Sequence, residues 1–154
     1  MTIEDDIAFL ERVPSFAILG RDALRILAIG AESRYVHGGE VLFTVGDPAD
    51  GGYVIQDGSF TLKTDNIDAT AAGLTVTRGT LLGELALLTE TTRPVTAIAA
   101  EPSTVIRVTR SLFLKMLEGY PDAAVRLRDD ILRRAEESAR NMYLVRSALD
   151  ESSP

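Results

Sequence analysis

Three residues that lie between two β-prone segments, Gly83, Glu84 and Arg93, combine types that together can bind a charged ligand. Gly83 and Glu84 open the run GELALL, which predicts about one helical turn, and the N–H groups at the start of such a turn attract anions. The Arg93 guanidinium can bind a phosphate through two parallel hydrogen bonds. The Glu84 carboxylate repels phosphate but accepts a hydrogen bond from a hydroxyl group. An anion beside a hydroxyl, with apolar walls, predicts a sugar phosphate; the simpler alternatives place Glu84 and Arg93 in solvent.

The elements that must position these residues are short strands. From Ser33 to about Val108, β-prone runs such as VLFTV, YVIQ, SFTLKT and VTAIA recur, separated by the turn signals GDPADGG and QDG. Many short strands with regular turns predict a mainly β fold, either a sandwich, a jelly roll or a barrel.

Helices are predicted on both sides of the strands. Residues 3–31 contain two amphipathic runs, the first with Thr2 as a candidate N-cap and the second ending near Gly30. Residues 110–149 read as a helix stopped by Gly119 and Pro121, followed by a long helix from Pro121, where a proline fits the first turn. Residues 150–154 form a predicted tail, and 1–149 are predicted to be one domain.

Composition narrows the function classes. The chain has 154 residues, is 45% hydrophobic and carries a net charge of −7, which suits one globular domain and disfavours direct DNA binding. The acidic N-terminus resembles no secretory signal, and no apolar run approaches the ~20 residues that span a bilayer. We therefore expect a cytoplasmic protein without a membrane segment.

A metal site is not expected. The chain has no cysteine and a single histidine, His37, beside two glycines in a predicted surface turn. A metal-dependent jelly-roll enzyme of the cupin type normally gathers several histidines with a carboxylate. That enzyme is kept as the least favoured alternative, and no cofactor is predicted.

The segments LERVPSFAIL, GGEVLFTVGDPADGGYVIQDGSFTL, RGTLLGELALL and EPSTVIRVTRSLFLKMLEGYPDAAVRLRDDIL, in this order, resemble the cyclic-nucleotide-binding domain family. The family includes the catabolite activator protein and the regulatory subunits of protein kinase A. The resemblance implies a β jelly roll (double-stranded β-helix) over residues 33–109, flanked by the helices. It also implies that the GELALLTETTRPVTA stretch is the phosphate-binding cassette.

The resemblance assigns roles within the cassette. Glu84 would hold the ribose 2′-hydroxyl, Arg93 and the amides around Leu85 and Ala86 would hold the cyclic phosphate, and Thr96 would start the next strand. The implied ligand is cAMP, with cGMP as the alternative. The full set of expected ligand contacts is Leu62, Leu74, Leu82, Gly83, Glu84, Leu85, Ala86, Arg93, Pro94, Val95 and Ser138.

The cassette departs from the family pattern beside Arg93. The family usually has Pro before this arginine and Ala, Ser or Thr after it, whereas here Thr92 and Pro94 occupy those places. The residue after the arginine commonly donates its amide to the phosphate, and Pro94 has no N–H to donate. Leu82 also replaces a frequent aromatic residue. The departure favours a second reading, a degenerate domain that acts as a dimerisation or interaction scaffold without nucleotide.

The long final helix has two predicted roles that the sequence leaves open. Its apolar row, interrupted by Arg128 and Arg146, fits either a homodimer seam or a face packed on the β body. The row consists of Val125, Leu132, Ala135, Ala139, Met142 and Leu149. By the family alignment, Ser138 reaches the base of the nucleotide, and Met142 or Tyr143 is the alternative lid.

The charged residues of this helix, with Asp129, Asp130, Glu136 and Glu137 among arginines that include Arg134, predict a solvated face of salt bridges. The sequence therefore predicts a non-enzymatic cyclic nucleotide sensor that signals through its last helix to an unidentified effector protein. Because the chain ends just past that helix, no DNA-binding module is expected.

Overall fold

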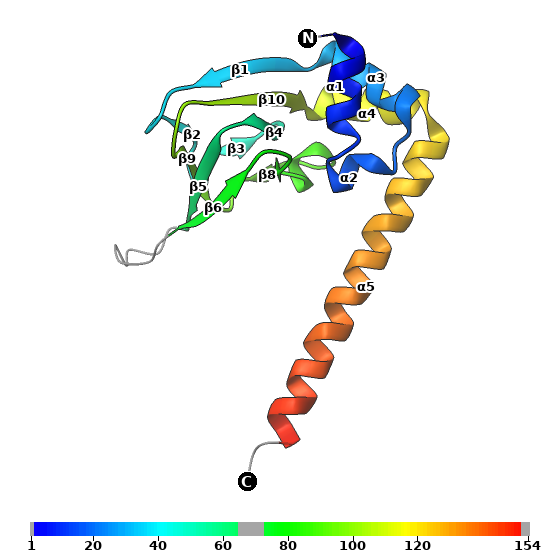
Figure 1. Ribbon diagram of the computed structural model, residues 1–154. Coiled ribbons are helices and arrows are strands. Elements are labelled where there is room, and N and C mark those ends of the chain that lie inside the picture. Colours follow the sequence, from blue (N-terminus) through cyan, green and yellow to red (C-terminus); the bar gives the residue numbers. More distant parts are fainter. Residues whose placement is uncertain (1, 65–72, 152–154) are drawn as a thin grey trace.

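The computed structural model describes residues 2–64 and 73–151. Antiparallel strands form the body of the molecule, a group of helices packs at one end of it, and one long helix extends away from that end (Figure 1). The predicted fold class, mainly β with N-terminal helices and a long C-terminal helix, is confirmed.

Local signals explain where the helices begin. Thr2 caps the first helix: its side chain accepts a hydrogen bond from the Asp5 amide, and the Asp5 carboxylate accepts one from the Thr2 amide. Pro121 stands at the first position of the last helix, which extends to Glu151 rather than ending near Leu149. The helices are α1 (Ile3–Leu10), α2 (Pro14–Ala17), α3 (Arg21–Gly30), the 3-10 turn η1 (Leu85–Leu87), α4 (Arg110–Gly119) and α5 (Pro121–Glu151).

The strands form two four-stranded antiparallel sheets and one small pair. One sheet has the order β1-β10-β4-β7, the other has the order β2-β9-β5-β6, and β3 pairs with β8. The strands are β1 (Glu32–Val36), β2 (Val41–Phe43), β3 (Pro48–Ala49), β4 (Gly51–Asp57), β5 (Ser59–Lys63), β6 (Leu74–Thr77), β7 (Leu81–Leu82), β8 (Thr91–Thr92), β9 (Thr96–Ala99) and β10 (Ser103–Thr109).

Two apolar clusters hold these layers together. One lies between the helical group and the sheet that contains β4 and β10; its fully buried members include Phe16, Leu24 and Phe113. The other lies between the two sheets and includes Phe60 and Val105. The burial of these side chains stabilises the β body and, through the first cluster, fixes the helices at its end.

The chain brings the predicted site together through β4 and its neighbours. Tyr53 of β4 pairs with Leu82 of β7, the residue immediately before Gly83. The pair formed by β3 and β8 places Ala49 opposite Thr91, two residues before Arg93. The residues just before Gly83 and those just before Arg93 are therefore both paired with residues 48–54, a segment that overlaps GDPADGG.

Candidate ligand-binding site

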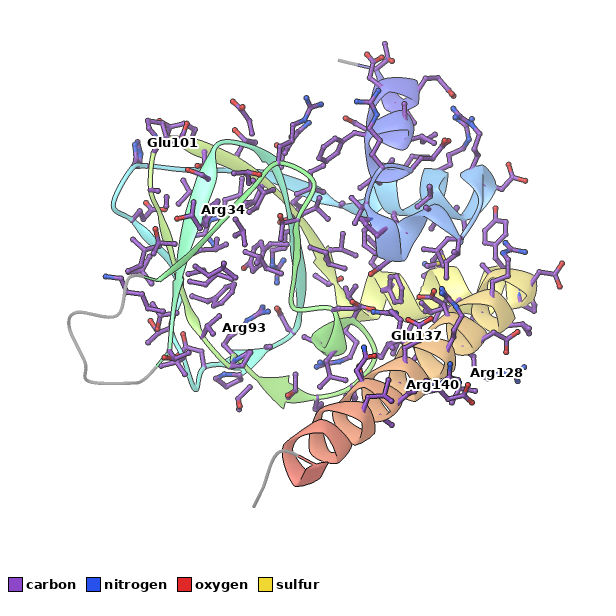
Figure 2. All side chains as sticks on the ribbon, turned by 60° about the horizontal axis from the view of Figure 1, so that its bottom comes forward. Arg34, Arg93, Glu101, Arg128, Glu137 and Arg140 are labelled. Atoms are coloured by element: carbon purple, nitrogen blue, oxygen red, sulfur yellow. The ribbon has the colours of Figure 1, made fainter. Side chains whose placement is uncertain are left out.

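Arg93 follows β8 and its backbone is fixed by the turn after β2. Its amide donates to the Asp47 carbonyl at 2.8 Å, and its carbonyl accepts from the Gly46 amide at 2.8 Å. The side chain points into the β body (Figure 2). Arg93 is only 4% exposed, whereas Arg34 of β1 is an exposed arginine. The structure therefore contradicts the alternative of a loop arginine in water.

The Arg93 guanidinium is buried without a counter-charge. None of the ion pairs in residues 2–64 and 73–151 includes it, and its Nη1 atom is buried with no hydrogen-bond partner in the same residues. Burial lowers the pKa of Arg93 below its usual value, against the smaller opposing effects of Tyr53, Asp50 and Asp47. An arginine stays charged in proteins. A buried charge without a partner is costly, which indicates a place for an anionic ligand.

Gly83 provides the room beside this guanidinium. Its φ is +88°, in the region that favours glycine. A Cβ atom built on Gly83 would lie 2.4 Å from Arg93 Nη1, a separation that atoms in contact do not reach. The sequence prediction that Gly83 and Arg93 belong to one site is consistent with this close approach.

The turn after Gly83 is η1, the short helical turn predicted for GELALL. The Ala86 amide donates to the Gly83 carbonyl at 3.1 Å. That amide, which the sequence interpretation assigned to the phosphate, is already engaged. From α4, Arg110 Nη1 lies within hydrogen-bond distance of the carbonyls of Ala49, Ala86 and Thr89, at 3.0, 3.2 and 2.9 Å. One guanidinium thus fixes η1 to the small sheet.

A pocket of about 250 Å³ opens at this point. It contains six of the residues predicted from the sequence together with parts of β3 and β8. Its walls are Ala49, Gly83, Glu84, Leu85, Ala86, Thr91, Thr92, Arg93 and Pro94. The buried guanidinium and the glycine therefore border a cavity rather than packed protein.

A second pocket, of about 350 Å³, adjoins the first and lies between η1 and α5. Glu84 and Leu85 line both pockets. Its other walls are Leu88, Ile131, Arg134, Ala135 and Ser138. The position predicted for Ser138, facing the cassette from the long helix, agrees with this pocket.

Four predicted contacts lie outside both pockets. Leu82 is buried between the sheets, and Leu62 and Val95 pack against the same cluster. Leu74, paired with Leu62 across β5 and β6, is 67% exposed. Their assignment as ligand contacts stays a prediction. The lid prediction for Met142 and Tyr143, and the Met142 and Leu149 positions of the apolar row, fall on side chains outside those described.

Glu84 is bound by an arginine of the last helix, which corrects the interpretation of that helix as a uniformly solvated charged face. Arg134 Nη1 donates to Glu84 Oε2 at 3.1 Å, and Nη2 donates to Oε1. Asp130 approaches the same arginine, with Oδ2 3.0 Å from Nε. The hydrogen bonds that Arg134 donates to Glu84, and then the charge of Glu84, raise the pKa of Arg134 despite partial burial. Arg134 and Asp130 therefore face the cassette.

The remainder of that charged face is as predicted. Arg133 pairs with Asp130 at 2.5 Å and with Glu137 at 3.6 Å, and Arg128 pairs with Asp129 at 3.3 Å. Figure 2 labels Arg128, Glu137 and Arg140 along α5, and all three are exposed. The difference between these residues and Arg134 is their position around the helix axis.

The sequence interpretation missed three contributors. Phe43 and Tyr53 place their rings against the Arg93 guanidinium, with Cζ 4.5 Å and 5.5 Å from the ring centroids. Both occur in β-prone runs, where aromatic residues normally indicate core packing. Arg134 could not be distinguished by residue type from the other arginines of its helix. Its helical face, shared with Ile131, Ala135 and Ser138 at spacings of three and four residues, was the available signal.

The sequence model of the cyclic nucleotide-binding domain family matches residues 33–120, more than half of the chain. This protein belongs to the cyclic nucleotide-binding domain family. The match runs from β1 through the cassette to the end of α4, and thus contains Gly83, Glu84 and Arg93.

Solved structures of other proteins also resemble the chain. A cyclic nucleotide-binding-like protein from Brucella abortus is 38% identical and has a TM-score of 0.67, with 74% of this chain and 98% of that chain covered. The N-terminal domain of a transcriptional regulator from Streptomyces coelicolor is 26% identical, with a TM-score of 0.79 and coverage of 87% and 94%.

The curated relatives are much longer proteins. A cAMP-dependent protein kinase regulatory subunit from Yarrowia lipolytica is 28% identical over 102 residues, which are 66% of this chain and 26% of the relative. The neuropathy target esterase of Drosophila persimilis is 32% identical over 107 residues, 64% of this chain and 8% of the relative. The domain therefore occurs in regulatory proteins and also within proteins that contain an enzyme.

Two kinds of feature are absent from the described residues. Across residues 2–64 and 73–151, no helix has the length and apolar character needed to cross a membrane. Within the same ranges, no three residues of the types His, Cys, Asp and Glu lie close enough together to hold a metal ion.

Proposed function

We propose that this domain is a non-enzymatic sensor that binds a cyclic nucleotide, with cAMP as the favoured ligand, and signals through α5. The observation that carries the proposal is the buried Arg93 guanidinium, which has no counter-charge in the described residues and borders a pocket beside Gly83. A cyclic phosphate carries one negative charge and acceptor oxygens, and therefore supplies what this guanidinium lacks.

The phosphate contacts follow from the free donors. Arg93 would provide the charge, and the Leu85 amide at the start of η1 would provide a second donor, because the first N–H groups of a helical turn have no partner within it. The Ala86 amide donates to Gly83 in this structure. We therefore assign the phosphate chiefly to Arg93 and Leu85.

The ribose is assigned to Glu84, which also gives a route to α5. A carboxylate accepts strong hydrogen bonds from either a hydroxyl or a guanidinium. Arg134 of α5 holds both Glu84 oxygens here, so that a ribose 2′-hydroxyl would compete with it or share the carboxylate. The ligand would thereby change the contacts of α5. The helix would then take different positions in the free and the bound protein, and this difference would carry the signal to an effector protein.

The base is assigned to the second pocket, between η1 and α5. Leu88, Ile131 and Ala135 provide apolar surface there, and Ser138 provides a hydroxyl. The serine can donate to or accept from a purine, which leaves the choice between cAMP and cGMP to experiment.

A scaffold that binds no nucleotide is the second candidate. Pro94 removes a donor beside Arg93, and α5 exposes large apolar side chains, with Val125 45%, Leu132 55% and Leu144 57% exposed. These residues are consistent with a homodimer formed through α5 or with another protein bound to it.

A thermal-shift panel of cAMP, cGMP and cyclic dinucleotides separates the two candidates. A ligand present at 100 times its dissociation constant adds about 2.7 kcal/mol to the stability of the folded state that it binds. The sensor proposal predicts a clear rise in melting temperature with cAMP. If millimolar concentrations of every nucleotide leave the melting temperature unchanged, the scaffold replaces the sensor.

Glu84→Gln should weaken the binding of cAMP more than the binding of 2′-deoxy-cAMP. A hydrogen bond to a charged group contributes about 1.5–3 kcal/mol, and the deoxy ligand has no 2′-hydroxyl with which to make it. We expect the preference for cAMP over the deoxy ligand to fall about tenfold or more. Glu90→Gln, at an exposed position six residues later, is the matched control for charge. Equal losses for the two ligands would show that Glu84 does not hold the ribose.

Pro94→Ala should tighten cAMP binding, because alanine restores an amide donor next to Arg93. The expected gain in binding free energy is about 1–2 kcal/mol, or about five- to thirtyfold in affinity. This value is already reduced by the greater freedom of the unbound loop once the proline is removed. Pro48→Ala, a proline of the neighbouring β3 outside the pocket, is the control. Weaker binding by Pro94→Ala in calorimetry would mean that the ring itself shapes the pocket.

A further inference from the structure

We infer that Phe43 and Tyr53 are positioning residues of the anion site, and that their rings hold the Arg93 guanidinium in place before a ligand arrives. The inference rests on the proposed function, in which Arg93 binds the phosphate. It concerns what keeps a buried, charged side chain in position while its pocket contains no anion.

The two rings come from opposite sheets. Phe43 ends β2 of one sheet, and Tyr53 lies in β4 of the other. Their centroids are 6.0 Å apart and their planes differ by 27°. Phe43 is 8% and Tyr53 is 7% exposed. Arg93 lies over both rings, at 4.5 and 5.5 Å, and therefore contacts the two sheets at once.

These rings replace part of the hydration that burial removes from the guanidinium. The negative face of an aromatic ring attracts a cation, and the attraction grows when the pair is desolvated. Arginine suits this contact better than lysine because its planar group stacks on a ring. With no carboxylate paired to Arg93 in the described residues, the aromatic faces are its principal favourable contacts.

Contact with the rings also leaves Nη1 of Arg93 available. A cation–π contact uses the charge of the guanidinium and none of its N–H groups. Nη1 is the atom that a Gly83 Cβ would approach to 2.4 Å, and it has no partner in the described residues. The rings thus hold a side chain that lines the pocket and keeps a donor for the phosphate.

The test compares cAMP affinities of folded variants by calorimetry. Tyr53→Leu and Phe43→Leu remove one ring each, and each should weaken cAMP binding about thirtyfold, the fold-change that corresponds to a desolvated cation–π contact. Tyr53→Phe keeps the ring and should recover most of the affinity. The matched control is Phe9→Leu, because Phe9 is 7% exposed and also lies under an arginine, Arg78, at 5.1 Å, outside both pockets.

A double-mutant cycle separates positioning from a general loss of structure. In an Arg93→Lys background, removal of the Tyr53 ring should weaken cAMP binding less than threefold, because lysine does not stack as arginine does. A merely structural role would give the same loss in both backgrounds. The inference is overturned if Tyr53→Leu and Phe43→Leu fold and retain wild-type affinity, or if Phe9→Leu loses as much affinity as they do.

If the ring variants do not fold, a measurement on the ligand-free wild-type protein tests the inference instead. In the wild-type protein, the Nε–H proton of Arg93, assigned by its disappearance in Arg93→Lys, should exchange with water at least tenfold more slowly than that of the exposed Arg78. Equal exchange rates would contradict the inference. If the wild type does not bind cAMP but the Nε–H proton of Arg93 exchanges slowly, the proposed ligand is refuted. The contact between Arg93 and the two rings is then still supported.

Discussion

Arg93→Met should abolish cAMP binding and, at the same time, raise the melting temperature of the ligand-free protein. Arg93 is 4% exposed, and its Nη1 atom has no hydrogen-bond partner within residues 2–64 and 73–151. An unsatisfied buried polar group costs about 1–3 kcal/mol, and methionine fills a similar volume while contacting the rings of Phe43 and Tyr53. We expect a rise of about 2–4 °C for each kcal/mol recovered in a chain of this length.

The binding loss in Arg93→Met should be about a hundredfold or more, since removal of one partner from a buried charge pair costs about 2–5 kcal/mol. Differential scanning fluorimetry with and without cAMP measures both effects in one experiment. Arg34→Met, at an exposed position of β1, is the control and should change neither quantity. A variant that is destabilised without ligand would show that Arg93 is a structural residue rather than one held ready for an anion.

Gly83→Ala should produce the second largest effect, a loss of both stability and ligand affinity. The positive φ of +88° costs a non-glycine residue about 1–3 kcal/mol. The new methyl group would also meet Arg93 Nη1 at 2.4 Å and displace the guanidinium. We expect cAMP affinity to fall about thirtyfold or more, as when a buried charge loses its partner.

Gly79→Ala is the matched control for this substitution. Gly79 has a φ of +90°, nearly that of Gly83, but a Cβ atom there would meet nothing within 4 Å. The two variants share the cost of the backbone conformation, and only Gly83→Ala adds the collision with Arg93. Chemical denaturation and calorimetry on both proteins separate the two contributions. Equal cAMP affinities for the two variants would contradict the proposed role of Gly83.

The core of the site was accessible from the sequence because its signals are local. Gly83 and Glu84 open a turn, and Arg93 returns after a short loop, so that turn chemistry and spacing were enough to group them. The same holds for the N-cap of α1 at Thr2 and the start of α5 at Pro121. Each of these features depends on neighbours within a few residues.

The contacts that were not foreseen join residues far apart in the chain. Arg134 lies 50 positions after Glu84, and only the helical face that it shares with Ile131 and Ser138 distinguishes it from Arg133. The rings of Phe43 and Tyr53 have the periodicity of core residues, which conceals their contact with a charge. The elements β3, β7 and β8 have two residues each, too few to show any period.

The most direct test of the proposed sensor function is a calorimetric titration of the wild-type chain with cAMP, run in parallel with Arg93→Met. We expect saturable binding of one cAMP per chain by the wild type and no measurable heat of binding for the variant. Absence of binding by the wild type at about 1 mM cAMP, a concentration that would reveal even a weak site of about −4 kcal/mol, would contradict it. Equal binding by both proteins would also contradict it, because the ligand would then bind without the buried guanidinium.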